Sequence, residues 1–126
     1  MNQGNLYSTD EEHRFKRFRK TNGYANMPLD GLWLRGPYLH NGSVPTVMDL
    51  LSASSERPRI FYRGNDIIDQ QDLGFVSDTP VAYGRELFLM DVSIDGNGNR
   101  GHEGYQYGTE LNEQEKRALI EYLKTF

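Results

Sequence analysis

The chain contains no cysteine and no long apolar run, and these absences exclude several kinds of protein. Without Cys, it forms no disulfide and no Cys-based zinc site, has no Cys nucleophile, and cannot attach haem through the thioethers of a CxxCH motif. No run approaches the roughly 18 apolar residues that a membrane span requires. The N-terminal sequence MNQGNLYSTDEE lacks the basic and apolar regions of a signal peptide, so we expect no export signal in this chain.

The net charge is also small. A formal net charge of -4 over 126 residues gives no reason to expect nucleic acid or an anionic membrane as the main partner. The chain is 37% hydrophobic and 12% aromatic, which allows one modest core, and 13 Gly with five Pro favour a loop-rich fold. We therefore expect a single domain over residues 1–126, with no linker and no second domain.

Standard catalytic motifs are missing as well. The sequence has no GxSxG, HExxH or Walker motif, and no GxGxxG at a strand-to-helix junction. His13, His40 and His102 lie far apart, and none has a second His at metal-ligand spacing. Because no acid, base or nucleophile pair is readable, an independent enzyme is the least favoured function.

Three segments have helical signals. Thr9 and Glu12 form a capping-box pattern before a basic segment, which predicts a short helix over about residues 10–19. Phe15 and Phe18 lie three apart there, so we interpret its cations as a solvated face rather than a nucleic-acid patch. Thr46 precedes Asp49 by three residues and predicts a capped helix over about residues 47–53.

The C-terminal segment gives the clearest helical pattern. Asn112 and Glu115 have capping-box spacing. Charged residues at four-residue spacing, Glu113, Arg117 and Glu121, indicate a solvated face. The apolar face consists of Leu119, Ile120, Leu123 and Phe126. We expect this helix to dock on the core.

Strand signals are weak. Residues 59–63 and 87–94 are each typical of a strand and predict one small antiparallel ribbon. Between the second strand and the last helix, Asp95, Asn97 and Asn99 have the spacing of the first three ligands of a calcium loop. The calcium pattern then fails, since Arg100 and Gln106 stand where Gly and Glu belong. We favour a Gly-rich turn that uses Asn for positive φ.

The segment from Pro28 to Leu51, PLDGLWLRGPYLHNGSVPTVMDLL, is apolar but has no clear period. Its Gly and Pro forbid a long regular element, while burial of a large apolar side chain stabilises by roughly 1.5 to 3 kcal/mol. The sequence therefore predicts an ordered loop that aims side chains at a common target. We expect Trp33, Tyr38 and His40 to face one concavity. The alternative for His40 is a hydrogen-bonded structural residue.

Several runs of the sequence carry a family resemblance. The core run is PYLHNGSVPT, and the other runs are RPRIFYRGND, GFVSD and GNGNRGHEGYQYGTEL. By these runs, the chain from about Leu6 onward resembles the C-terminal part of a bacterial c-type cytochrome family, related to di-haem cytochrome c peroxidases and to the rubber-oxygenase group. The resemblance implies a mainly α, cytochrome c-like fold of short helices and long ordered loops, with at most a small two-stranded ribbon.

The resemblance also implies haem c in intact relatives, a periplasmic location and an electron-transfer or peroxidase-like role. In those relatives CxxCH lies upstream of the part seen here, so the chain resembles a C-terminal portion without the attachment segment. We expect this chain to be haem-free by itself. Its expected partners are the upstream haem-bearing segment or a redox partner protein.

By the same resemblance, five residues are candidates for one wall of a haem pocket. Trp33 and Tyr38 would pack on the porphyrin, Arg35 would pair with a propionate, and His40 would contact a propionate or lie near the iron. Met27 is the favoured distal ligand over Met48 and Met90, although an apolar filler is the commoner role of Met. The second function class is a haem-free interaction module that uses the same aromatic loop.

Overall fold

The computed structural model describes residue 23 and residues 26–126, and the predicted helix at about residues 10–19 lies outside them. Short elements and ordered loops alternate along the described part. In chain order the elements are η3 (Leu32–Leu34), α1 (Val47–Leu50), β1 (Ile60–Arg63), β2 (Ile68–Asp69), β3 (Gly74–Phe75), β4 (Val81–Ala82), β5 (Arg85–Glu86), β6 (Phe88–Asp91), η4 (Tyr105–Tyr107) and α2 (Glu113–Leu123).

The prediction of a mainly α fold with at most one small ribbon is wrong. In the described residues the α-helices have 4 and 11 residues, and the strands form three antiparallel two-stranded sheets. The physical reason is the spacing of Gly, Pro and Asp between residues 57 and 108, which leaves no uninterrupted segment long enough for a stable helix.

The predicted pairing of residues 59–63 with 87–94 is confirmed. Strand β1 pairs with β6 in the register Ile60↔Asp91 to Arg63↔Phe88. The cross-strand neighbours Phe61 and Met90 are 3% and 2% exposed. Burial of this pair fixes the register, because a slip by one residue would move both side chains to the solvent face.

The other two ribbons are hairpins that strand patterns did not indicate. Strands β4 and β5 are joined by Tyr83 and Gly84, both with positive φ, which is the backbone that a two-residue hairpin turn requires. Between β2 and β3, Asp69 Oδ1 accepts hydrogen bonds from two backbone N–H groups, at Gln71 and Asp72. Each strand has only two residues, too few for a periodic signal.

Helix α1 confirms the predicted cap. Thr46 Oγ1 accepts from Asp49 N at 3.1 Å and donates to Asp49 Oδ2 at 2.7 Å. The helix ends earlier than predicted, at Leu50. Its first N–H groups find partners in the loop before β3, because Val47 N donates to Leu73 O and Met48 N to Asp72 O. Helix α1 is therefore anchored at its N-terminus by the β2–β3 hairpin.

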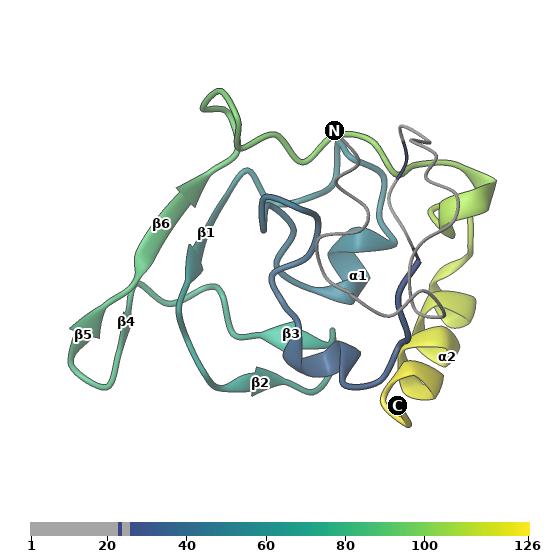
Figure 1. Ribbon diagram of the computed structural model, residues 1–126, viewed down its shortest axis with the longest axis horizontal. Coiled ribbons are helices and arrows are strands. Elements are labelled where there is room, and N and C mark those ends of the chain that lie inside the picture. The colour runs from purple at the N-terminus through teal and green to yellow at the C-terminus, as the bar shows by residue number, and fades with distance from the viewer. Residues whose placement is uncertain (1–22, 24–25) are drawn as a thin grey trace, which may run out of the picture.

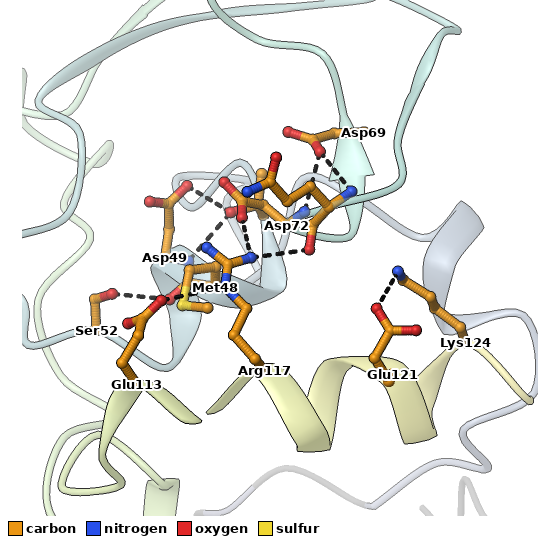
Figure 2. A network of polar contacts seen from close by, with 11 residues as sticks. Met48, Asp49, Ser52, Asp69, Asp72, Glu113, Arg117, Glu121 and Lys124 are labelled. Atoms are coloured by element: carbon orange, nitrogen blue, oxygen red, sulfur yellow. Dashed lines mark hydrogen bonds and ion pairs between the residues drawn. The ribbon is translucent and has the colours of Figure 1, made fainter. Parts of the chain in front are cut away.

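Helix α2 confirms the capping box at Asn112 and Glu115, with both reciprocal hydrogen bonds present. Ile120 and Leu123 are buried, Leu119 packs partly buried against the core, and Phe126 is exposed. Arg117 forms the predicted pair with Glu113, whereas Glu121 pairs with Lys124 (Figure 2).

The hydrophobic core lies between α1, α2 and the loop before α1. Its buried members are Tyr38, Val44, Val47, Met48, Leu51, Leu73, Ile120 and Leu123. In the view of Figure 1, α1 occupies the centre, with the β1–β6 ribbon on one side and α2 on the other. No helix in the described residues is long and apolar enough to cross a membrane.

Candidate functional site

The loop before α1 is ordered by its own backbone. Tyr38 and Val44 exchange hydrogen bonds of 2.7 and 3.3 Å and close a turn. Within the turn Leu39 and Gly42 have positive φ, and the Gly36–Pro37 peptide bond is cis. The loop therefore has a defined path, as the sequence predicts for residues 28–51.

This turn is docked on the Gly-rich loop that follows β6, residues 95–104. Asn41 Nδ2 donates to Gly96 O at 3.2 Å and to Gly98 O at 2.8 Å, and Ser43 Oγ donates to Gly98 O. Asn41 Oδ1 is buried without a hydrogen-bond partner among the described residues. The side chains of Asn41 and Ser43 thus connect two loops that are more than 50 residues apart in the sequence.

Arg57 holds the other end of the Gly-rich loop. Its side chain is buried and donates to six backbone carbonyl oxygens. These belong to Asp49, Leu50, Ser52, Asn99, Gly101 and His102. Burial lowers the pKa of Arg57, and the charges of Glu103 and Asp49 oppose that shift. A guanidinium stays charged and carries five N–H groups in one plane, so it can donate to several carbonyl oxygens at once. Arg57 therefore ties the Gly-rich loop to the end of α1.

In the Gly-rich loop, two of the three side chains with calcium-loop spacing make hydrogen bonds through their amide N–H groups. Asn97 and Asn99 donate their amide groups to the carbonyls of Asp91 and Pro58. No group of three or more His, Cys, Asp or Glu in the described residues is placed to hold a metal ion. The idea that Asn supplies positive φ here is wrong, since the residues with positive φ are Gly96, Gly101, His102 and Gly104.

Two of the five candidate haem-wall residues pack in or against the core. Tyr38 belongs to the core cluster, and Trp33 packs partly buried against it. The Tyr38 hydroxyl donates to Leu32 O at 2.9 Å, and burial raises the pKa of Tyr38 to about 12. Tyr38 is therefore a neutral hydrogen-bond donor, and its bond to Leu32 O holds the first residue of the 3-10 turn η3.

The other three candidates lie at the surface. Met27 is 71% exposed. Arg35 is exposed and donates from Nη1 to Pro28 O at 2.9 Å, and His40 is exposed. The two less favoured Met candidates for the distal ligand are buried. Met48 lies in the core, and Met90 lies on β6 opposite Phe61.

Two cavities in the described residues are lined by other side chains. One, of about 570 Å³, lies between the loop before α1, β1, β6 and the end of β3. Its lining is Gly36, Pro37, Pro45, Phe61, Tyr62, Arg63, Gly64, Asn65, Phe75, Val76, Ser77 and Phe88. The other, of about 820 Å³, is polar. It is lined by Ser54, Ser55, Arg57, Arg59, Val92, Ser93, Gly98, Asn99 and Arg100.

Sequence reasoning missed both cavities. One signal was available for the first, because Phe61 and Arg63 lie two apart on a strand and so share a face. Phe88 joins them through the β1–β6 pairing, which the sequence predicts, whereas Phe75 joins them through the β2–β3 hairpin, which no sequence pattern indicates. For the polar cavity, the clustering of Arg57, Arg59 and Arg100 depends on the Gly-rich loop folding back.

Comparisons with known proteins find one family model that matches part of the chain, and two relatives. Residues 23–62 match the family model described as RoxA-like, cytochrome c-like. The chain is 44% identical over 111 residues to uncharacterized protein y4iJ of Sinorhizobium fredii, a match that covers 81% of this chain and 17% of that protein. It is 37% identical over 123 residues to uncharacterized protein y4iM of the same organism, covering 82% and 27% respectively.

The chain thus spans about a sixth to a quarter of the length of these relatives. The absence of Cys excludes covalent haem attachment within this chain. At a coarse level, the segment at residues 23–62 is similar to a cytochrome c-like domain.

Proposed function

We propose that this chain is the part of a cytochrome c-like domain that covers haem, once a segment with CxxCH completes the domain, and that its role is electron transfer in the periplasm. One observation carries the proposal. The family match at residues 23–62 contains all five candidate residues, Met27, Trp33, Arg35, Tyr38 and His40. Those residues lie in or beside the ordered loop 28–51.

The donor chemistry of the loop is compatible with haem at one axial position. Met27 offers a thioether that is 71% exposed, and His40 offers an exposed imidazole; both groups are known axial ligands of haem iron. Bound haem would supply one-electron chemistry. Because the described residues hold no Cys, the thioether bonds and the second axial ligand would come from another segment.

An apolar surface beside the loop supports completion by such a segment. Met27, Leu29 and Leu34 are 71%, 43% and 53% exposed. The same region meets the end of α2, where Gly31 N donates to Phe126 O and the rings of Tyr122 and Phe126 touch edge to face. Exposed apolar side chains this close together in the sequence make this segment a candidate interaction surface.

The same surface favours a second function, that of a haem-free interaction module. In that reading the partner packs on Met27, Leu29 and Leu34 without any cofactor. Arg35 Nη1 is engaged with Pro28 O, which braces the loop but leaves the exposed apolar side chains at the surface. The two functions differ in whether the completed domain binds haem.

The test is to express this chain alone and together with the coding sequence that precedes it, in cells able to mature c-type cytochromes. We expect the chain alone to carry no haem after a denaturing gel, and the longer protein to carry haem if CxxCH is encoded there. Absence of CxxCH from that sequence would favour the interaction module.

A matched pair of variants addresses the ligand in the longer protein. Met27→Ala should abolish the absorption signature of methionine-ligated oxidised haem, whereas Leu29→Ala, which removes a neighbouring exposed apolar side chain, should leave it intact. Identical spectra for Met27→Ala and the wild type would remove Met27 as a ligand.

A further inference from the structure

The 570 Å³ cavity is formed by three separate parts of the chain. Pro37 and Pro45 come from the loop before α1, Phe61 and Arg63 from β1, and Phe75 from β3. Its volume lies within the roughly 300–1,000 Å³ that small-molecule sites occupy. None of the five candidate haem-wall residues lines it. A ligand in this cavity would therefore bind apart from the proposed haem wall.

The walls of the cavity are fixed before any ligand arrives. Phe61 is 3% exposed and lies opposite Met90 in the β1–β6 ribbon. Tyr62 N donates to Ser77 O at 2.8 Å and links β1 to the segment after β3. A Cβ atom at Gly36 would lie 3.5 Å from Pro45 O and 3.6 Å from the Phe75 ring, so these walls are in contact at one end. A preformed cavity binds without a large ordering cost.

The lining is aromatic, and part of it is open to solvent. Phe61 forms a buried wall, Phe75 is half-buried, and Phe88 on β6 is 64% exposed. Aromatic rings at such a rim are favourable partners for a flat apolar molecule, because ring pairs attract each other beyond the effect of the area that they bury.

The charge of the lining has one sign. Arg63 is the only charged residue among the described residues that line it. Arg63 is held against the turn at residues 39–43, where Nη1 donates to Asn41 O at 3.4 Å and a Cβ atom at Gly42 would lie 2.9 Å from Nη2. That is the single hydrogen bond that the Arg63 side chain makes with the described residues, although a guanidinium carries five N–H groups. Arg63 is therefore placed to receive a carboxylate.

We propose that this cavity binds a flat, largely apolar organic anion. The rings of the ligand stack among Phe61, Phe75 and Phe88, and its carboxylate pairs with Arg63. The charge of the lining selects the anion over its neutral analogue, and the aromatic walls select it over a small inorganic anion.

The test uses naphthalene carboxylate and its neutral carboxamide as probes, titrated into the full chain by calorimetry. The carboxylate should bind in a saturable way, and the carboxamide about tenfold more weakly, since a hydrogen bond to a charged group contributes about 1.5–3 kcal/mol. Arg63→Gln should weaken the carboxylate about tenfold and leave the carboxamide unchanged. Phe88→Ala, which removes an exposed ring, should weaken both probes.

The matched control is Arg85→Gln, which removes an exposed Arg from β5 outside the cavity lining and should change neither affinity. Urea unfolding of each variant shows that loss of binding is not loss of folding. Equal affinity of the carboxylate for the wild type and Arg63→Gln, or no binding at millimolar probe, would overturn the proposal. Haemin is titrated in parallel. Displacement of the probe by one equivalent of haemin would contradict the proposal that the cavity is separate from the haem wall.

Discussion

Arg117 on α2 donates from Nη1 to Asp72 Oδ1 at 2.6 Å, and the same nitrogen donates to Gln71 O at 3.0 Å (Figure 2). Asp72 lies in the turn between β2 and β3, whose backbone carbonyls also accept from the first N–H groups of α1. The hydrogen bond with Asp72 is the main cause of the raised pKa of Arg117. A single guanidinium therefore joins α2 to the hairpin that anchors α1.

The first prediction concerns this link. Arg117→Gln should lower the free energy of unfolding by about 1 kcal/mol, because partly exposed ion pairs contribute about 0.2–1 kcal/mol and the hydrogen bond to Gln71 O is also lost. The control is Glu113→Gln, which removes only the i,i+4 pair and should cost about 0.3–0.5 kcal/mol. Urea unfolding measures both. Equal losses would show that the Asp72 contact adds nothing.

The second prediction concerns the docking of α2. Leu123 is 9% exposed and belongs to the core cluster, so Leu123→Ala should cost about 2–5 kcal/mol. That is a large share of a total stability of about 5–15 kcal/mol. Gln114→Ala, at an exposed position of the same helix, is the control and should change stability by less than about 0.5 kcal/mol. Coincident urea midpoints for Leu123→Ala and the wild type would contradict a docked helix.

The third prediction concerns Arg57. Arg57→Lys keeps the charge but loses the planar fork, so several of the six carbonyl groups lose their donor. We expect the Gly-rich loop to open, with a loss of about 3 kcal/mol or more in the free energy of unfolding, given about 1–3 kcal/mol for each buried group left unsatisfied.

Limited trypsin digestion followed by mass spectrometry reads this opening directly, because Arg100 lies in the same loop. Cleavage after Arg100 should be faster in Arg57→Lys than in the wild type. The control Arg59→Lys changes an Arg that is 74% exposed and should leave the cleavage rate unaltered. No acceleration in Arg57→Lys would mean that other contacts hold the loop closed.

The fourth prediction concerns pH. Burial raises the pKa of Asp49, the hydrogen bond from Thr46 opposes the shift, and the charges of Asp72 and Asp69 add to it. A carboxyl whose pKa is higher in the folded state binds protons more tightly there. Its contribution to stability is therefore fully present below the unfolded pKa and is lost as pH rises through the folded pKa.

Asp49→Asn removes that titration and keeps an acceptor for the Thr46 hydroxyl. The variant should therefore gain stability relative to the wild type as pH rises from the acid range to neutrality. Urea unfolding at a series of pH values gives the difference between the two proteins. A difference that stays constant across the series would show that Asp49 does not titrate differently in the folded state.

Local signals in the sequence were sufficient for elements whose determinants lie within a few residues. The cap at Thr46 and the capping box at Asn112 were predictable because the donor and acceptor lie three residues apart. The β1–β6 pair was also predictable, since each strand has an apolar pattern of its own. The hairpins β2–β3 and β4–β5 were not, because two-residue strands carry no period and their turns depend on positive φ at Leu73 and Tyr83.

The sequence by itself determined that no covalent haem forms in this chain, since that depends only on the absence of Cys, and that α2 and the N-terminus of α1 are capped helices. Only the tertiary structure decided where the candidate side chains lie. Tyr38 is in the core, while Met27 and His40 are at the surface. Placement of this kind depends on contacts between distant segments, such as Asn41 with Gly98 and Arg63 with Gly42, and no local pattern encodes the distance between them.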